Sequence, residues 1–265
     1  MKHKLGFLIA FMLVLTRPAF ATAQATDQAS AHAADLTVLS AAAMKGVVQK
    51  VPDRFFAATG AHVHFVFGTA GQIREKVLAG DRFDVVILPP ALLSDLAKRG
   101  IVEGASIKDV GSVRIGAAVK TGDPLPNIGD EASFKQTLLG AVSIGMADPA
   151  SGATSGIYLA KLMDRLGVTE AIRAKVKYYP EGQTAMEAMA KGEVTLGIGQ
   201  TSEIMPVHGV TLVGPIPENL QLKTIYAAGI ASKDSSQVLA QKFRAYVTGA
   251  QVRASLKANG FDPGS

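Results

Sequence analysis

The chain has 265 residues, with 27 basic and 22 acidic side chains and no cysteine. The lack of cysteine excludes disulfides, thiolate catalysis and cysteine-ligated zinc. Three of the basic residues fall within positions 1–25, so the remainder carries 24 basic against 22 acidic side chains and is almost balanced. Lys and Arg do not cluster among aromatic residues, and we therefore expect no nucleic-acid partner.

The N-terminus has the pattern of a secretory signal peptide. Lys2 and Lys4 precede an apolar run at 5–15 that is too short to span a bilayer, and small residues at 19–25 offer cleavage sites. We predict a signal peptide over 1–25, a flexible tether over 26–35 and a periplasmic location. An uncleaved N-terminal anchor is the alternative.

From residue 36 onward, short β-rich runs alternate with amphipathic stretches. The pattern predicts strands at 36–39, 62–67 and 84–88, each followed by a helix, at 45–59, 72–78 and 92–98. Strands that alternate with helices in this way indicate an α/β fold with a parallel sheet covered on both faces.

A second alternating set follows a strand at 112–119. Its predicted elements are helix 133–139, strand 141–146, helix 157–166, strand 175–179, helix 184–190 and strand 195–199, and a strand at 223–231 and helices at 237–248 and 252–259 close the chain. We interpret 112–119 and 223–231 as strands that cross between two lobes, as in hinged ligand-binding proteins. Lobe 1 is predicted to contain 36–115 and 227–265 and lobe 2 to contain 116–226, each a mostly parallel sheet flanked by helices. A single doubly wound sheet is the alternative.

Four loops rich in glycine and hydroxyl groups lie where predicted strands give way to helices. Helix N-termini present backbone N–H groups, and small residues let an anion approach them. Helix capping alone would explain any single loop, but four loops in equivalent positions favour an anion site. The candidate ligand-binding residues in them are Ser40, Ala43, Met44, Thr69, Ala70, Gly71, Ser151, Thr154, Ser155, Gln200 and Thr201.

Two arginines are further candidates for ligand contact. Arg74 lies early in the helix after the second loop, and Arg114 interrupts an apolar crossing strand. The guanidinium group suits a carboxylate because it can donate two parallel hydrogen bonds. A solvated helix face explains Arg74 equally well.

Other functional motifs do not match. The sequence contains neither the phosphate loop nor the dinucleotide fingerprint, and 152–156 has the wrong spacing for a hydrolase nucleophile elbow. His62 and His64 could coordinate a metal, but the favoured interpretation is that they are a surface pair on one strand face with no metal bound. We therefore expect no metal and no cofactor.

Several segments together resemble a known family. These are "TVLSAAAMKGV", "FGTAGQIREKVLAGDRFDVVIL", "GMADPASGATSGIYLAKLMDRLGV" and "TLGIGQTSEI". They resemble the periplasmic substrate-binding proteins of ABC importers in the type 2 arrangement, specifically the molybdate-binding branch. The resemblance implies a monomeric Venus-flytrap protein that closes on a small anion and delivers it to an inner-membrane permease.

The same resemblance points away from molybdate as the ligand. Two serines and a tyrosine that the branch uses as donors align with Ala43, Ala70 and Gln200. We therefore expect an organic di- or tricarboxylate. The branch includes periplasmic aconitate isomerases, which makes a cofactor-independent isomerase the alternative to simple solute binding, with a sensor role as a third reading.

An isomerase would need a base, and several titratable groups lie in or beside the predicted cleft loops. These are Tyr158, Glu181, Glu203 and His208. Their spacing marks none of them as the base, so the sequence leaves the catalytic residue open.

Overall fold

The computed structural model describes residues 35–233 and 237–263, which belong to one compact unit. The predicted signal peptide, and the tether up to residue 34, lie outside these residues. Among the described helices, none combines the length and the hydropathy that crossing a bilayer requires.

The first sheet has six strands in the order β11-β4-β10-β3-β1-β2. Their bounds are β1 (Asp35–Ala41), β2 (His62–Gly68), β3 (Val85–Leu88), β4 (Lys108–Val113), β10 (Thr224–Ile230) and β11 (Phe261–Pro263). β1 is parallel to β2 and β3, whereas β10 runs antiparallel to β3 and β4, and β11 antiparallel to β4. This sheet is therefore mixed, because β10 and β11 run against the other four strands, which all point the same way.

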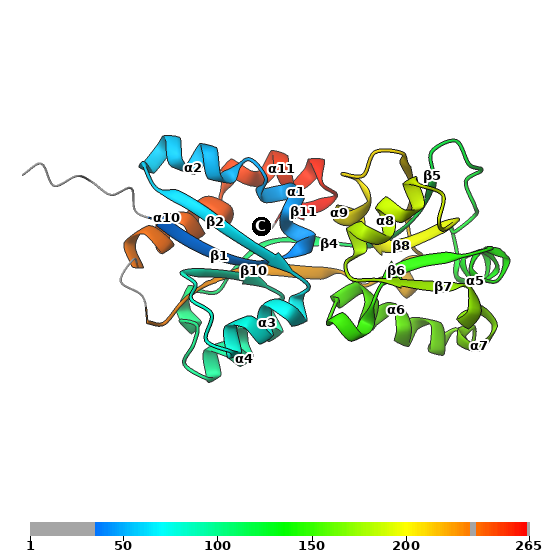
Figure 1. Ribbon diagram of the computed structural model, residues 1–265, viewed down its shortest axis with the longest axis horizontal. Coiled ribbons are helices and arrows are strands. Elements are labelled where there is room, and N and C mark those ends of the chain that lie inside the picture. The colour runs from blue at the N-terminus through cyan, green and yellow to red at the C-terminus, as the bar shows by residue number, and fades with distance from the viewer. Residues whose placement is uncertain (1–34, 234–236, 264–265) are drawn as a thin grey trace, which may run out of the picture. The chain divides into compact units, whose positions relative to one another are not determined.

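Helices cover both faces of the six-stranded sheet (Figure 1). One face carries α1 (Lys45–Val48), α2 (Val51–Thr59), α10 (Gln237–Val247) and α11 (Arg253–Ala258), and the other carries α3 (Ala70–Leu78) and α4 (Pro90–Lys98). The helix predicted over 45–59 is divided into α1 and α2. Pro52 lies in the first turn of α2, where its missing N–H group breaks no helical hydrogen bond, whereas inside one long helix it would.

The second sheet has five strands in the order β7-β6-β8-β5-β9. Its strands are β5 (Ile115–Lys120), β6 (Ile144–Ala147), β7 (Val176–Tyr179), β8 (Leu196–Gln200) and β9 (Val210–Pro215). β6 is parallel to β7 and β8, while β5 is antiparallel to β8 and β9, so this sheet is mixed too. The strands β9 and β11 were not predicted.

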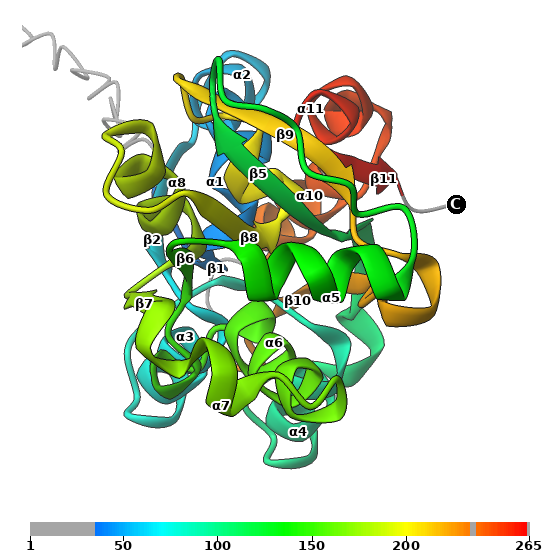
Figure 2. The same cartoon turned by 90° about the vertical axis from the view of Figure 1, so that its right-hand side faces the viewer.

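The helices of the second lobe also lie on both faces of their sheet. α5 (Glu131–Gly140), α6 (Thr154–Arg165) and α7 (Thr169–Ile172) cover one face, and α8 (Gly182–Ala190) and α9 (Thr201–Ile204) cover the other. Figure 2 looks onto this lobe with α5 in front of the sheet. Separate apolar clusters fill the two faces, one around Phe134 and Leu159 and one around Met186 and Ile204. These clusters fix the strand ends that carry the loops.

The chain passes between the sheets twice. Arg114 alone separates β4 from β5, so the predicted strand 112–119 crosses between the sheets but is divided between them. The return lies between β9 and β10, not within 223–231 as predicted, because β10 pairs with β3 and β4. The two-lobe α/β fold is confirmed, and the predicted lobe boundaries stay a prediction.

Candidate functional site

A small cavity lies between the two sheets. Its volume is about 20 Å³, which is room for about one water molecule. The six-stranded lobe contributes Ala41, Ala42, Ala43, Thr69, Ala70 and Tyr226, and the five-stranded lobe contributes Ala153, Thr154, Ser155, Glu181, Gln200 and Glu203. The alanines that follow β1 leave space for a ligand against the backbone.

Three helices of two turns or more begin at this cavity. Thr69, Ala153 and Glu181 are the N-cap residues of α3, α6 and α8. Thr69 caps α3 through a reciprocal pair of hydrogen bonds with Gln72, the pattern that the sequence "TAGQ" favours. The positive ends of these helix dipoles attract negative charge, so the arrangement suits an anion.

The two lobes touch through their loops around the cavity. The Thr69 hydroxyl donates to the carbonyl of Ser151, and the Gly71 N–H donates to the carbonyl of Gly152 at 3.0 Å. A Cβ atom on Gly71 would lie 2.7 Å from the Cα of Gly152, so this approach requires glycine. Beside these loops, Lys45 Nζ lies 2.7 Å from Glu181 Oε2. The structure is therefore a closed form.

Two polar side chains that line the cavity are buried and incompletely paired. Gln200 is 2% exposed and Glu203 is 7% exposed. The Tyr226 hydroxyl donates to Gln200 Oε1 at 3.0 Å, but Gln200 Nε2 and Glu203 Oε2 have no hydrogen-bond partner within residues 35–233 and 237–263. Folded proteins rarely leave such groups unpaired, and a ligand in the cavity could pair with both.

Glu203 has the most strongly shifted carboxyl group of the site. Burial raises the pKa of Glu203 to about 7, and the negative charge of Glu181 acts in the same direction. The backbone N–H groups of Gln200 and Gly182 oppose this shift, as does the charge of Lys45. Burial also raises the pKa of Tyr226. A carboxyl group with a pKa near neutrality can accept or donate a proton at the pH of most cells.

The structure brings together part of the predicted site. Six of the predicted residues line the cavity, namely Ala43, Thr69, Ala70, Thr154, Ser155 and Gln200. Gly71 and Ser151 form contacts between the lobes, and the Thr201 hydroxyl donates to the carbonyl of Gly260 at 3.0 Å. Met44 is buried in the apolar core of its lobe, and the Ser40 hydroxyl donates to the carbonyl of Ala41.

The two predicted arginines have protein carboxylates as partners. Arg74 lies within 3.1 Å of Asp95 and 2.7 Å of Glu75, and its hydrogen bond lowers the pKa of Asp95. Arg114 lies 2.6 Å from Glu218. Neither arginine lines the cavity, so their predicted contact with a ligand has no support from this arrangement.

Three residues of the site are not among the candidate ligand-binding residues, although two of them, Glu181 and Glu203, are among the possible bases. Glu181, Glu203 and Tyr226 line the cavity. Of the other titratable groups considered, the Tyr158 hydroxyl donates to the carbonyl of Leu220, and His208 lines a separate groove. The sequence could have indicated a role for Glu203 in the site, because it lies three residues after Gln200. Acidic residues are common at helix starts, however, since they interact favourably with the helix dipole.

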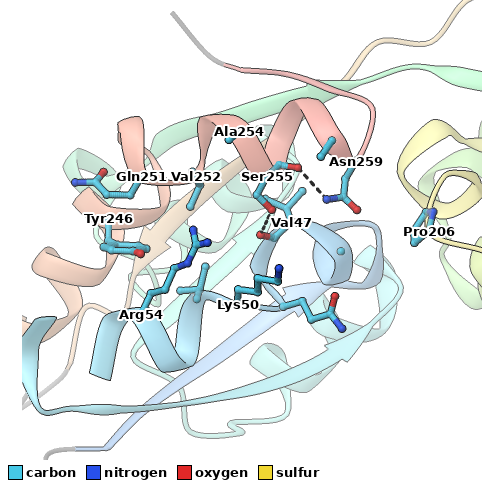
Figure 3. Close-up of a pocket in the computed structure, with 14 residues that line it drawn as sticks. Val47, Lys50, Arg54, Pro206, Tyr246, Gln251, Val252, Ala254, Ser255 and Asn259 are labelled. Carbon is cyan, nitrogen blue, oxygen red and sulfur yellow. Dashed lines mark hydrogen bonds between the residues drawn. The ribbon is translucent and has the colours of Figure 1, made fainter. Parts of the chain in front are cut away.

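A second, wider pocket of about 370 Å³ lies beside the helices of the first lobe. Figure 3 shows Lys50 and Arg54 on one side of it and Tyr246, Ser255 and Asn259 on the other. The Ser255 hydroxyl donates to the carbonyl of Val47 across this pocket. None of the predicted site residues lines it, so the cavity between the lobes remains the candidate site. Within the described residues, no group of three or more His, Asp or Glu side chains is placed to hold a metal.

Comparison with known proteins places the chain in a family. An aconitate isomerase from Pseudomonas sp is 30% identical over 234 residues, which cover 86% of this chain and 87% of that protein. The periplasmic molybdate-binding protein of Azotobacter vinelandii superposes with a TM-score of 0.72 at 18% identity, over 87% of this chain and 100% of that one. The sulfate-binding protein SubI of Mycobacterium tuberculosis superposes with a TM-score of 0.71 at 20% identity, over 87% of each chain. Residues 36–262 match the model of the bacterial extracellular solute-binding proteins, and this chain belongs to that family.

Proposed function

We propose that the chain is a periplasmic protein that binds a small organic di- or tricarboxylate between its lobes and presents it to an ABC-type importer. The observation that carries the proposal is the pair of buried, unpaired groups, Gln200 Nε2 and Glu203 Oε2, at a cavity where helix N-termini meet. A carboxylate oxygen would accept a hydrogen bond from the Gln200 amide and gain from the helix dipoles. Membership in the solute-binding family supports the same role.

The donor set favours a carboxylate over molybdate. Ala43, Ala70 and Gln200 line the cavity at the positions where the molybdate-binding branch is expected to supply hydroxyl donors. The closed cavity has a volume of about 20 Å³, so a polycarboxylate would enter only with the lobes apart and would keep them wider apart at the cavity than they are in this structure. Separation of the lobes is the ordinary motion of hinged two-lobe proteins.

Calorimetric titration tests the ligand. We expect trans-aconitate or a related tricarboxylate to bind, and molybdate to bind weaker by two or more orders of magnitude. Each donor lost to a charged group costs roughly 1.5–3 kcal/mol, and about 1.4 kcal/mol corresponds to a tenfold change in affinity. The panel should contain trans-aconitate, cis-aconitate, citrate, molybdate, tungstate and sulfate.

A pair of variants links the binding to the cavity. Gln200→Ala should weaken the organic ligand by about tenfold or more, because it removes a charge-assisted hydrogen bond. Gln183→Ala, on the neighbouring helix α8, is the matched control and should bind as the unmodified protein does. Tight molybdate binding with no organic anion bound would contradict the proposal.

Isomerisation of aconitate is a second candidate function. The observation that favours it is the 30% identity to an aconitate isomerase over 86% of the chain. The reaction moves one proton and one double bond within the substrate, so it needs a group that can take up and return a proton. The cavity offers two carboxyl groups, those of Glu181 and Glu203.

Incubation with trans-aconitate separates the two functions. An isomerase should form cis-aconitate without added cofactor, because the reaction leaves the oxidation state unchanged, and proton NMR would follow both isomers. Protein-free buffer and the Gln200→Ala variant are the controls. Binding of trans-aconitate without conversion over hours, at high protein concentration, would leave solute binding as the function.

A further inference from the structure

The carboxyl group of Glu203 lies in space that is free because residue 182 has no side chain. A Cβ atom on Gly182 would lie 2.1 Å from Glu203 Oε2, so glycine at the start of α8 leaves room for this oxygen. Glu203 lines the cavity and its Oε2 atom has no partner among the described residues. The backbone N–H groups of Gln200 and Gly182 favour the charged form of Glu203, but an oxygen that is buried without a donor still makes that form costly unless the group is protonated or meets a donor.

Three titratable groups face Glu203 from the elements around it. Glu181, before α8, adds a like charge, and Lys45, from α1, adds an opposite one. Lys45 is paired with Glu181 at 2.7 Å, which limits what it offers to Glu203. Tyr226, on β10, donates a hydrogen bond from its hydroxyl group to Gln200. It stays neutral because burial raises its pKa. None of the three neutralises Glu203 directly.

Glu203 can be charged or neutral when an anion enters this cavity. The charged carboxylate of Glu203 repels the anion, whereas the neutral carboxylic acid can donate a hydrogen bond to it. The added negative charge favours the protonated form further. We propose that the site captures its anionic ligand together with one proton, which Glu203 Oε2 takes from solvent and donates as a hydrogen bond to a carboxylate oxygen of the ligand. The inference rests on the proposed binding of an organic anion. It deepens that function, because it makes capture dependent on pH.

The sign of the pH dependence follows from the closed, ligand-free structure, in which burial raises the pKa of Glu203 to about 7. Below that pH the proton is already present and binding takes up none. Above it each binding event must supply the proton, so the affinity falls by about tenfold for each pH unit. Binding is therefore expected to be tighter at about pH 6 than at about pH 8.

Calorimetric titration of trans-aconitate measures the proton directly. Titrations at several pH values, each in two buffers of different ionisation enthalpy, give the number of protons bound with the ligand. At about pH 8 we expect an uptake of about one proton, and close to none at about pH 6. Glu203→Gln keeps a neutral donor of the same shape, so it should abolish the uptake and hold the affinity nearly constant over this range.

The control is Glu187→Gln, an exposed carboxylate of α8 that does not line the cavity, which should leave the uptake unchanged. Because every variant receives the same ligand, titration of trans-aconitate itself cancels between them. Uptake that persists in Glu203→Gln would overturn the inference. So would a folded Glu203→Gln that binds at no pH, because binding would then require the carboxylate.

A measurement on the ligand-free protein distinguishes failure of this inference from failure of the proposed function. Carbon-detected NMR of the glutamate side chains should show Glu203 titrating at about pH 7 even if no anion of the panel binds. A midpoint close to the ordinary value of a glutamate would overturn the inference alone. Absence of binding by every anion of the panel would overturn the proposed function and the inference together.

Discussion

Substitution of Gly71 by alanine should weaken ligand binding by about 100-fold while the protein stays folded. The new Cβ atom would lie 2.7 Å from the Cα atom of Gly152, and backbone atoms cannot rotate away from it. The loops would have to separate, which breaks the hydrogen bond from the Gly71 N–H to the Gly152 carbonyl and strains the neighbouring contact between Thr69 and Ser151. Ligand affinity therefore falls because the closed form becomes costly. Calorimetric titration with trans-aconitate measures it.

Gly140→Ala is the matched control for this substitution. Gly140 also lies in a helix, α5, but a Cβ atom there has no neighbour within 4 Å. Both substitutions improve helix propensity, so the thermal midpoint should not fall in either variant through loss of helix. Equal affinities for Gly71→Ala and Gly140→Ala would show that closure of these loops does not contribute to binding.

Phe243→Ala should lower the free energy of unfolding by about 3–5 kcal/mol, the usual cost of removing a buried aromatic ring. Phe243 is fully buried, and its ring packs edge to face on Phe55 at a centroid distance of 5.4 Å. It joins α10 to α2 against the six-stranded sheet, so its loss leaves a cavity shared by two helices and Phe65. Urea denaturation followed by circular dichroism gives the change.

Phe56→Ala tests whether burial of the ring is the cause of the stability loss expected for Phe243→Ala. Phe56 is the neighbour of Phe55 on α2, is 43% exposed and stacks on His62 at a centroid distance of 4.5 Å. Its removal should cost about 1 kcal/mol or less, because much of its surface is in contact with solvent even in the folded protein and no enclosed cavity is left behind. Similar losses in Phe56→Ala and Phe243→Ala would contradict the assignment of Phe243 to the core.

The periodicity of the sequence was sufficient to predict both sets of strands and helices and the first crossing. It missed β9 and β11, which are antiparallel partners of β5 and β4, because pairing between distant segments leaves little local pattern. Thr69, Ala70 and Gln200, which the loop composition predicts as ligand contacts, lie together at the cavity because the carboxyl ends of strands in the two sheets meet there; their contact with a ligand stays a prediction.

The charged residues of the site were harder to predict. Arg74 is an attractive anion ligand in the sequence, but Asp95, supplied by the next helix, lies 3.1 Å from it. Glu203 looks like an ordinary acidic residue at a helix start, and its burial arises when α9 packs against α8 of its own lobe and beside η1 (Ala42–Met44) of the other. Whether a charge serves a ligand or a protein partner depends on tertiary contacts that local sequence does not record.

The contacts that close the cavity also govern how long a ligand remains bound. The cavity of about 20 Å³ is too small for the proposed polycarboxylate, so the ligand-bound protein must hold the lobes wider apart there than this structure does. The ligand can enter or leave only when the Lys45–Glu181 pair and the Gly71–Gly152 contact have separated. The rate of opening is then an upper limit on the dissociation rate. Residence time becomes a property of the protein as much as of the ligand, and substitutions at the loop contacts should shorten it even where they touch no ligand atom.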